Sequence, residues 1–429
     1  MKKYIPRIAD ELLKIYLECS GAVLIEGPKW CGKTTTAKQI AASVVELGDP
    51  DKEEEYFTLA SISPSKLLEG ATPHLIDEWQ RIPRLWDSVR TMVDRRGGFG
   101  HFILTGSATP LKKEEDKRRH SGTGRISRLV MRPFSLYESG DSSGAVSLSS
   151  LFNGQTDVNA FGEIDIDKLS FLCCRGGWPE VCISENMSIR AQLMTSRSYV
   201  DAICSNEVDY DDGVSYDRER LSRFMRSYAR SLGSQRSVSD MVSDMTSSGS
   251  FSFSDKTAYE YHAMLQGIFA VEDMPAWNPN LRSKTAIRTS DTRYFCDPSI
   301  AVASLGLGPC DMINDLQTFG FVFENLCMRD LRVYSGAIDG RVYHFRDKNN
   351  LECDAVIHLA NGKYGLVEVK LGGKDAIEYG AKSLLKLLDK IDEEKMGKPS
   401  FLMVLVGVGS YAYKRNDGVL VVPINLLGP

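Results

Sequence analysis

Residues 27–34 read GPKWCGKT, a glycine-rich stretch with the spacing G-x-x-x-x-G-K-T. In such a loop the backbone amides can surround phosphate groups, Lys33 can reach the terminal phosphates, and the Thr34 hydroxyl can ligate Mg²⁺. The apolar residues 22–25 precede the loop as a strand, and a helical pattern begins at about Lys33. A simple glycine turn would explain neither the lysine nor the hydroxyl, so the sequence predicts an ATP site. The residues expected to contact the nucleotide are Gly27, Pro28, Lys29, Trp30, Cys31, Gly32, Lys33, Thr34 and Thr35.

An adjacent pair of carboxylates follows a second short apolar run, in the stretch PHLIDEWQRI. We expect Asp77 to bind the nucleotide's Mg²⁺ and Glu78 to activate water. In isolation the pair would be read as a solvated strand end, but downstream of a phosphate loop it favours ATP hydrolysis. A small-molecule kinase is disfavoured, because the pair suits water better than a bound alcohol.

Two further groups are candidates for sensing or stabilising the γ-phosphate. The strand GHFILTGSAT ends in Thr105 and Ser107. Because ligands gather at the carboxyl ends of parallel strands, either residue is a candidate sensor of the γ-phosphate, and Ser107 is preferred. In the basic loop that follows, Arg125 enters the next strand and is the best candidate for a cation acting on the γ-phosphate, in the same subunit or a neighbouring one.

A second candidate site lies in the stretch LECDAVIHLANGKYGLVEVK, residues 351–370. If residues 360–362 form a three-residue loop with Gly362 in the left-handed conformation, Asp354 lies opposite Glu368 in the hairpin, and Lys370 shares their face. Like charges opposite each other destabilise a sheet, so a cation such as Mg²⁺ is expected between them. With a two-residue Asn-Gly turn, Asp354 would face away and the constellation would break.

Length and composition describe a globular chain of several domains. Its 429 residues suggest two to four domains, with 42% hydrophobic and 25% charged residues. The net charge of −5 argues against a nucleic-acid binder by overall electrostatics, so any such contact must come from local patches. Ten cysteines without a repeated C-x-x-C pair indicate reduced thiols. No apolar run approaches the length of a membrane span and no signal peptide is evident, so we expect a cytoplasmic protein.

The middle of the chain predicts a connector and then a helical region. Residues 138–166, rich in Ser, Gly and Asp, are expected to be a mobile connector, with a domain boundary near 160. Three helices and two extended segments between residues 217 and 297 are the elements of a winged helix, which can read DNA. The charges of the third helix favour a scaffold or protein-contact role, whereas Arg282, Lys284, Arg288 and Arg293 of the ribbon keep the DNA-reading alternative open.

The sequence resembles a family of AAA-like P-loop ATPases of bacteria and archaea, in which the ATPase domain precedes a C-terminal domain of unknown function with a restriction-endonuclease-like core. The resemblance rests on the stretches GPKWCGKTTTA, LIDEWQRIP, ILTGSA, GRISRLVMRPFSLYE, CRGGWPE and RYFCDPSIA, and spans nearly the whole chain. It implies an α/β fold with an AAA+-like ATPase domain at 1–160, a helical lid and winged-helix-like domain at 161–303, and a nuclease-like α/β domain at 304–429. It carries Lys33, Thr34, Asp77 and Glu78 into nucleotide and metal roles.

The same resemblance covers the C-terminal hairpin, where Asp354, Glu368 and Lys370 look like the D…E-x-K core of PD-(D/E)XK nucleases. Such nucleases often add a glutamate from the preceding helix, and Glu324 fits that place. Metal-bound carboxylates would lower the pKa of a water, and Lys370 would position it or stabilise the phosphorane. The alternatives are a retained fold that no longer cuts and a plain salt bridge of Lys370 with a carboxylate.

Two functions therefore stay open. One is an ATP-dependent switch whose nuclease-like domain acts on DNA or RNA, and the other is an ATPase regulator or scaffold whose C-terminal domain binds nucleic acid or protein without cutting. ATP and Mg²⁺ are the expected cofactors, and an oligomer is compatible with both.

Overall fold

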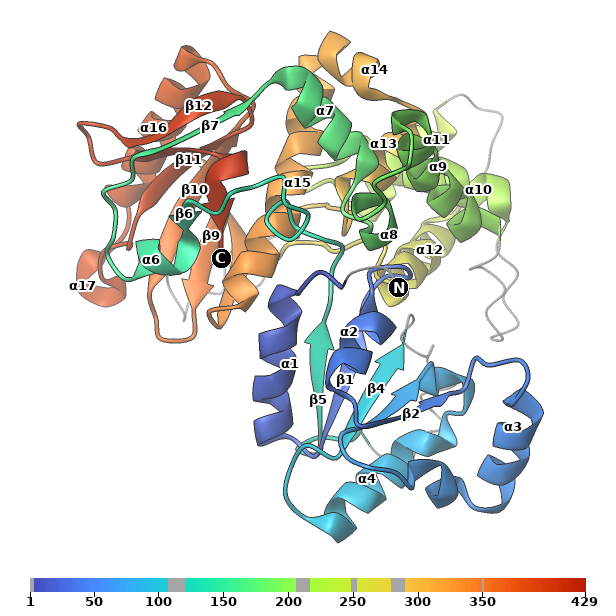
Figure 1. The fold of residues 1–429 in the computed structure, drawn as a ribbon. Helices are drawn as coiled ribbons and strands as arrows, with labels where there is room; N and C mark the ends of the chain where they lie inside the picture. The colour runs from blue at the N-terminus through green and yellow to red at the C-terminus, as the bar shows by residue number, and fades with distance from the viewer. Residues whose placement is uncertain (1–3, 107–120, 206–216, 248–252, 279–289, 349–350) are drawn as a thin grey trace. The chain divides into compact units, whose positions relative to one another are not determined.

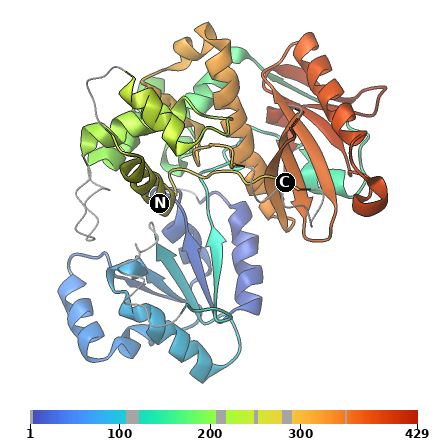
Figure 2. The same ribbon diagram turned by 180° about the vertical axis from the view of Figure 1, so that it is seen from behind.

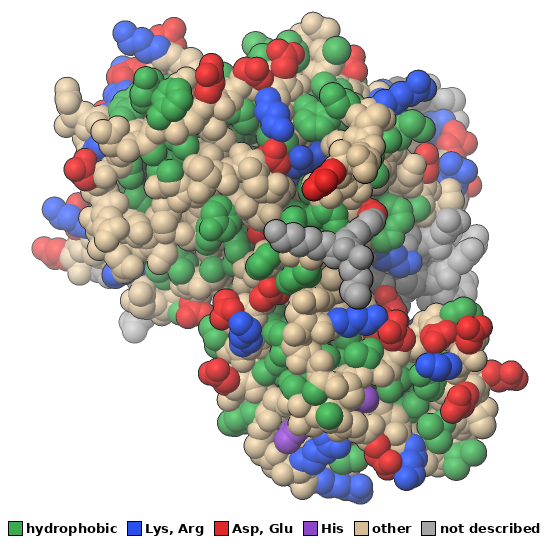
Figure 3. All heavy atoms as spheres, viewed as in Figure 1, with side chains coloured by type: hydrophobic (Ala, Val, Ile, Leu, Met, Phe, Trp, Pro, Cys, Tyr) green, Lys and Arg blue, Asp and Glu red, His purple; other side chains and the backbone are tan. Residues whose placement is uncertain are grey.

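The structure is a computed structural model that describes residues 4–106, 121–205, 217–247, 253–278, 290–348 and 351–429 (Figures 1 and 2). These residues pack as two compact units, one formed by the chain up to Pro133 with Met264–Phe269, and the other by the remaining described residues. On the face drawn in Figure 3, acidic and basic side chains are interspersed, in keeping with the small net charge.

The first unit is built on a five-stranded sheet in which every neighbouring pair is parallel. The strands are β1 (Ala22–Glu26), β2 (Ser43–Glu46), β3 (His74–Asp77), β4 (Phe102–Gly106) and β5 (Ile126–Val130), in the order β2-β3-β4-β1-β5. β1, β3 and β4 are buried along their whole length, as their unbroken apolar runs predict for a sheet covered on both faces. The carboxyl ends of all five strands therefore meet at one edge.

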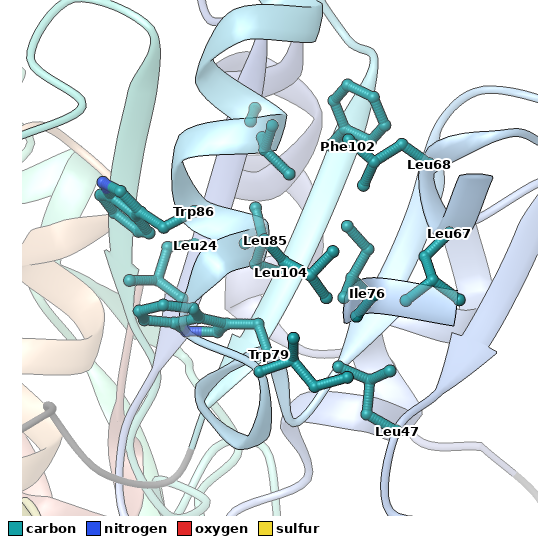
Figure 4. Packing of buried hydrophobic residues seen from close by; sticks show 14 of the residues in the cluster. Leu24, Leu47, Leu67, Leu68, Ile76, Trp79, Leu85, Trp86, Phe102 and Leu104 are labelled. Atoms are coloured by element: carbon teal, nitrogen blue, oxygen red, sulfur yellow. The ribbon is translucent and has the colours of Figure 1, made fainter. Parts of the chain in front are cut away.

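Helices cover both faces of this sheet. The helices α1 (Ile8–Cys19) and α2 (Lys33–Ile40) lie on one face, where Leu13 and Leu17 of α1 pack against the sheet. The other face carries α3 (Glu53–Ile62), η1 (Pro64–Leu68) and α4 (Arg84–Arg96). Figure 4 shows the core on this second face, with Trp79 of the short turn η2 (Trp79–Arg81) packed beside Leu24 and Leu104. The apolar spacing of α1 and α4 thus fixes both layers.

The second unit begins with a helical region. Its helices are α7 (Ile166–Arg175), α8 (Pro179–Cys182), α9 (Ile189–Ser205), α10 (Arg218–Ala229), α11 (Val238–Thr246), α12 (Asp255–Gly267), α13 (Pro298–Leu305) and α14 (Pro309–Asn314), of which α12 runs into the segment assigned to the first unit. Two antiparallel bridges, Val271 with Phe295 and Met274 with Thr292, join the segments after α12. The three expected helices are present, and these bridges join the two segments that were expected to form the ribbon, while the winged helix stays a prediction.

The DNA-reading alternative gains no support from the ribbon. Arg282, Lys284 and Arg288 lie outside the described residues, and Arg293 is buried, with its guanidinium donating to Asp273. Burial in this ion pair removes Arg293 from a phosphate-contacting role. Whether this region binds DNA or another protein stays a prediction.

A seven-stranded mixed sheet completes the second unit, in the order β7-β12-β13-β11-β10-β9-β8. The strands are β7 (Ala160–Ile164), β8 (Gly340–Arg346), β9 (Glu352–Leu359), β10 (Tyr364–Lys370), β11 (Leu402–Val406), β12 (Gly409–Lys414) and β13 (Leu420–Pro423). The long helix α15 (Leu316–Gly336) contacts β8, β9 and β10, and α16 (Lys374–Leu388) packs on β9, β10 and β11. The short helix α17 (Glu393–Met396) and the turn η4 (Ile424–Leu426) accompany them.

The segment expected as a mobile connector is instead part of this second unit. It forms β6 (Val146–Ser147), α6 (Leu148–Phe152) and β7, with β6 parallel to β14 (Leu427–Gly428) and β7 antiparallel to β12. Its serines bind backbone oxygens of the far end of the chain, as in the 2.6 Å bond from Ser142 Oγ to Leu427 O. The unit boundary accordingly lies near Pro133, not near 160.

A buried ion network around Arg329 ties α15 to two other segments of this unit. The Arg329 guanidinium lies 2.9 Å from Asp297 Oδ2 and 2.7 Å from Asp330 Oδ1, and the side chains of all three are at most 1% exposed. Asp330 also accepts the backbone N–H of Leu136, and Asp297 that of Gly177. Each buried charge is paired and hydrogen-bonded, the condition under which such a network is tolerated.

Candidate nucleotide site and carboxylate cluster

The phosphate loop follows β1 directly and is shaped by close backbone approaches. A Cβ added at Gly27 would lie 2.0 Å from the carbonyl oxygen of Met131, so only glycine fits. Gly32 adopts a left-handed φ of 97° and caps α2, whose first residue is Lys33. The Lys33 ammonium is buried and donates to the carbonyls of Gly27 and Pro28, at 2.9 and 2.8 Å. The strand, loop and helix expected from the motif are all present.

The residues of the loop differ in exposure. Cys31 is fully buried and its thiol points to Met131 O at 3.5 Å, so it packs the loop against the end of β5. Lys29 and Trp30 are exposed at the tip of the loop, and Thr35 is exposed on α2. Of the expected nucleotide contacts, Cys31 therefore has a packing role, while its backbone remains part of the loop.

Thr34 and the acidic pair meet at the carboxyl edge of the sheet. Thr34 Oγ1 donates to Asp77 Oδ1 at 2.7 Å, and Thr105 Oγ1, from the end of β4, donates to the same oxygen. Thr105 Oγ1 also accepts the backbone N–H of Glu78 at 3.3 Å. The structure thus brings together Thr34, Asp77, Glu78 and Thr105, which are 71 positions apart at most in the sequence.

Of the two remaining γ-phosphate candidates, only Arg125 lies among the described residues. Ser107 lies outside the described residues. Arg125 O accepts the N–H of Ala22, the first residue of β1, which places it roughly 13 Å from the loop end of that strand at about 3.3 Å per residue. Its side chain pairs with Asp94 of α4 at 2.9 Å. A role for Arg125 on the nucleotide of its own chain does not fit this position, and only the role in a neighbouring subunit stays a prediction.

Two arginines missed by motif reasoning support the loop. Arg7, buried before α1, donates to Cys31 O and to Arg132 O, both at 2.8 Å, and so joins the loop to the chain after β5. Arg128 of β5 donates to Glu26, the last residue before the loop, at 3.0 Å. Neither residue was assigned a role at this site from the sequence, because both act across large sequence separations.

The C-terminal hairpin has the register that was predicted from its turn. Leu359 N donates to Lys363 O, and Gly362 has a φ of 87°, as the three-residue loop requires. The ladder runs from Tyr364 opposite His358 to Val367 opposite Ala355. The next step of this register places Asp354 opposite Glu368.

At that step the ladder changes, because the pairing of β8 with β9 shifts by one residue between Tyr343 and Phe345. Such a bulge bends a strand and re-aims a side chain. Here the Asp354 carboxylate turns to accept the backbone N–H of Val369 at 2.7 Å, in place of a backbone partner. The bulge was not foreseen from the sequence.

Lys370 lies between the two carboxylates. Its ammonium is 2.6 Å from Glu368 Oε2 and 3.3 Å from Asp354 Oδ2, and both are hydrogen-bonded ion pairs. Ser383 of α16 donates to Glu368 Oε1 at 3.4 Å. Glu324 of α15 accepts a hydrogen bond from the Tyr294 hydroxyl, and its charge interacts with those of Asp354 and Lys370. Tyr294 and Ser383 were not identified from the sequence, since neither lies in the D…E-x-K pattern.

Burial and the neighbouring Asp354 charge make Glu324 and Glu368 weak acids. Burial, and then the nearby Asp354 charge, raise the pKa of Glu324 to about 8. The same two causes raise the pKa of Glu368 to about 8, although Lys370 opposes the shift. The pKa of Lys370 is itself raised by the charges of Asp354 and Glu368, against the effect of its burial. Protons bound by Glu324 and Glu368, together with the Lys370 ammonium, therefore offset the negative charge of the cluster.

The donor types suit Mg²⁺ or Mn²⁺, but the arrangement is not a ready metal site. Within the described ranges, no group of three or more His, Cys, Asp or Glu side chains is placed to hold a metal ion. The Lys370 ammonium instead bridges Asp354 and Glu368, which is the salt-bridge alternative weighed for this hairpin. Metal binding by Glu324, Asp354 and Glu368 stays a prediction that requires the lysine to move.

Comparison with protein families divides the chain into three regions. Residues 20–140 match the family described as an AAA domain, residues 166–311 match a domain of unknown function (DUF8612), and residues 319–427 match another domain of unknown function (DUF4143). The N-terminal region is thus similar to AAA-type P-loop ATPase domains. That part of the sequence prediction is confirmed, and neither of the other two descriptions assigns a function.

Whole-chain relatives add little about function. Uncharacterized proteins of Mycobacterium tuberculosis and Mycobacterium bovis are each 23% identical over 421 residues, covering 97% of this chain and 83% of theirs. Among solved structures, a Walker-type ATPase of Pyrococcus abyssi aligns with 70% of this chain and 96% of its own, at 14% identity and a TM-score of 0.44. The Aeropyrum pernix ORC1 protein in complex with DNA aligns with 71% of this chain and 93% of its own, at 14% identity and a TM-score of 0.22. Among the described helices, none is both long and apolar enough to cross a membrane.

Proposed function

We propose that this protein binds Mg-ATP at the phosphate loop and hydrolyses it, and that it works as an ATP-dependent switch. The observation that carries the proposal is the shared hydrogen bonding of Thr34 and Thr105 to one oxygen of Asp77, beside Glu78 and the buried ammonium of Lys33. This set combines the two oxygen groups that ligate Mg²⁺, a cation for the phosphates and a carboxylate for water.

In this proposal Lys33 exchanges its bonds to the carbonyls of Gly27 and Pro28 for bonds to the β- and γ-phosphates. Loop N–H groups and the start of α2 hold the phosphate chain. Thr34 and Asp77 would hold Mg²⁺, which would neutralise negative charge on the phosphate oxygens. Thr105 keeps Asp77 oriented through the hydrogen bond that it already makes.

Glu78 takes the proton in the chemical step. A water oxygen forms a bond to the γ-phosphorus, the bond from that phosphorus to the β–γ bridging oxygen breaks, and ADP leaves with the bonding electrons. One proton of the water passes to the Glu78 carboxylate and from there to solvent. The products are ADP and inorganic phosphate.

Equilibrium binding and phosphate release, measured on the full chain, test this function. Wild type should bind Mg-ATP and release phosphate over many turnovers, with both activities lost in EDTA. A folded wild type that neither binds ATP nor releases phosphate would overturn the proposal. Binding without release would reduce it to an ATP-binding regulator.

A second candidate function concerns the C-terminal cluster, and we propose it as metal-dependent cleavage of phosphodiester bonds in DNA or RNA. The supporting observation is that Lys370 contacts both Asp354 and Glu368 on one hairpin, with Glu324 interacting electrostatically with Asp354 and Lys370. The competing role is a scaffold that binds nucleic acid or protein without cutting, and the bridging position of Lys370 favours this competitor.

Cleavage assays separate these two roles. Single- and double-stranded DNA and RNA are incubated with wild type, Asp354→Asn and Glu368→Gln in Mn²⁺, and filter binding is run in parallel. Cleavage by wild type that both variants lack supports the nuclease. Equal binding by all three proteins without cleavage supports the scaffold.

A further inference from the structure

The cations of helix α10 are all arginines. They are Arg218, Arg220, Arg223, Arg226 and the C-terminal cap Arg230. Glu219 is the one acid of the same stretch, and no lysine occurs in it. A guanidinium group binds a phosphate through two parallel N–H donors, whereas a lysine ammonium acts as a point charge. A helix with this composition is therefore suited to anions that have phosphate geometry.

Three of these arginines lie in one row on the exposed side of the helix. The arginine row consists of Arg218, Ser222, Arg226 and Arg230, which recur every fourth residue and are all exposed. Residues four apart are neighbours on a helix surface and lie roughly 6 Å apart along its axis. α10 lies at the outer margin of the helical region in both ribbon views (Figures 1 and 2). The row can therefore contact a large ligand along its whole length.

The ion pairs of the arginine row neutralise it only in part. Arg226 has no ion-pair partner among the described residues. Arg218 lies 3.7 Å from Asp201, beyond hydrogen-bond distance, and the two side chains are 67% and 72% exposed. Arg230 pairs with Asp244 at 3.0 Å. Exposed pairs such as that of Arg218 are weak and screened by salt, so a polyanion can replace them.

The exposed side of α10 has no apolar centre of the kind that protein partners use. The large apolar side chains of this helix, such as Leu221 and Phe224, are buried. Protein interfaces generally have an apolar core that is depleted of charge, whereas nucleic-acid interfaces are polar and strongly cationic. The chemistry of the arginine row therefore favours a sugar-phosphate backbone over an acidic protein.

We propose that the arginine row binds the phosphodiester backbone of double-stranded nucleic acid, without regard to base sequence. A duplex of DNA carries one charge about every 1.7 Å along its axis, so one duplex can meet all three arginines at once. The Ser222 hydroxyl adds a donor for phosphate oxygens between them. The inference rests on the nucleic-acid-binding role proposed above and adds the surface that makes the contact. This surface is α10 and not the ribbon, where Arg293 is buried.

Fluorescence anisotropy of labelled duplexes, DNA and RNA in separate arms, tests the proposal from about 50 to about 200 mM salt. The full chain is used, because acids at 207–212, outside the described residues, precede α10 in the sequence. EDTA is present and ATP absent, so that neither the phosphate loop nor the carboxylate cluster contributes through a metal. The double variant Arg218→Gln/Arg226→Gln should bind at least about tenfold more weakly, and its slope of log K against log salt should be shallower by about 2, or ~0.9 per lost phosphate contact.

Two further variants separate charge from folding. Ser222→Glu places a carboxylate within the exposed row and should weaken binding at least about fivefold. Arg218→Lys/Arg226→Lys keeps both charges but loses the paired donors, so it should keep the salt slope within about 0.5 of wild type. A lysine variant that loses the slope as the glutamine variant does would overturn the role given to charge.

Arg84→Gln/Arg95→Gln is the matched control, because both arginines are exposed on α4 and the net charge changes equally. Its Kd for duplexes should stay within about twofold of wild type. Duplex binding that the α10 glutamine variant keeps, or that the α4 control loses equally, would overturn the inference and leave nucleic-acid binding to another surface. A wild type that binds polyglutamate as tightly as duplexes would overturn it in favour of an acidic protein. A wild type that binds no duplex removes the inference and the nucleic-acid role together.

Discussion

The Thr34 hydroxyl donates a 2.7 Å hydrogen bond to Asp77 although 43 residues separate them. Thr34 lies in the first turn of the helix after the phosphate loop. Asp77 ends β3, which is not adjacent to β1, because β4 lies between them. The bond shows that loop and acidic strand share one edge of the sheet. A metal held by both groups would replace this direct bond and keep the same geometry.

Replacement of Lys33 should abolish ATP binding. Lys33→Ala removes the buried ammonium that the loop presents to the phosphates, so titration should show an affinity at least about a hundredfold weaker. Lys38→Ala is the control, because Lys38 also lies on α2 but pairs with Glu46 on the exposed side. Unchanged affinity in a folded Lys33→Ala protein would refute the nucleotide site.

Binding and hydrolysis should separate at the acidic pair. Glu78→Gln keeps the metal ligand Asp77 but cannot take a proton from water, so it should bind Mg-ATP normally and turn over ~10²-fold or more slowly. Asp77→Asn should instead raise the Mg²⁺ concentration needed for tight binding. Equal turnover in wild type and Glu78→Gln would show that another residue activates the water.

Stability should fall as pH rises through the neutral range, because of the carboxylate cluster. The pKa values of Glu324 and Glu368 are each raised from an ordinary 4.5 to about 8. Between these values the folded protein binds more protons than the unfolded chain, so protonation favours folding and this contribution is lost toward pH 8. Glu324→Gln and Glu368→Gln should flatten the decline and melt at least about 2 °C above wild type at pH 8.5.

These melts are best run in EDTA, so that no divalent ion offsets the repulsion. Glu352→Gln is the control, because Glu352 is on the same strand but half exposed and paired with Arg346. It should change the pH profile much less than the other two variants, because its charge is only a minor cause of the raised pKa of Glu324. A wild-type profile that is flat from pH 5 to 8.5 would mean that the cluster is fully ionised in the folded protein.

Divalent metal should stabilise the C-terminal unit only when both hairpin carboxylates are present. On a Lys33→Ala background, Mn²⁺ should raise the melting temperature of the parent but not of Asp354→Asn or Glu368→Gln, because metal binds only the folded site. Lys370→Met should enlarge the shift, since its ammonium no longer competes for the same oxygens. No shift in either the parent or Lys370→Met would identify the lysine as the permanent counter-ion of this hairpin.

Removal of the Arg329 charge should destabilise the second unit strongly. Arg329→Met leaves Asp297 and Asp330 buried without their cation, a change that typically costs about 3–5 kcal/mol. Urea denaturation measures it. Arg346→Met removes an exposed partner of Glu352 and should cost at most about 1 kcal/mol. Similar losses for the two variants would contradict the role given to burial.

The sequence predicted correctly those parts of the two sites whose backbone geometry is set by residues adjacent in the chain. The turn glycine Gly362 set the hairpin register, and the motif from Gly27 to Thr34 placed the loop between strand and helix. Arg125 was predicted near the phosphates because it precedes a strand, but β5 runs parallel to β1. A residue that enters a parallel strand lies at the amino edge, opposite the loops that follow the strands.

The features that the sequence did not predict are contacts between residues far apart in the chain. Tyr294 reaches Glu324 from 30 residues away, and Arg7 reaches Arg132 across 125 residues. The bulge that turns the Asp354 side chain arises where β9 pairs with β8. The sequence of β9 alone does not predict this bulge. The serine and glycine content of residues 138–166 suggested a mobile connector. The strands formed by this segment were missed because their partners, β12 and β14, lie near the other end of the chain.

The pairing of β6 with β14 also constrains how the chain folds during synthesis. Ser142 and Ser147 bind backbone oxygens 285 and 282 residues further on. The five strands of the first unit, in contrast, all precede residue 131, so its sheet can form while the rest is still being translated. The segment around β6 and β7 must wait for β12 and β14 to leave the ribosome, and closing so long a loop makes this pairing a late, slow event. Until then an unpaired strand follows the first unit, and its free backbone groups are a site for unwanted pairing with another chain.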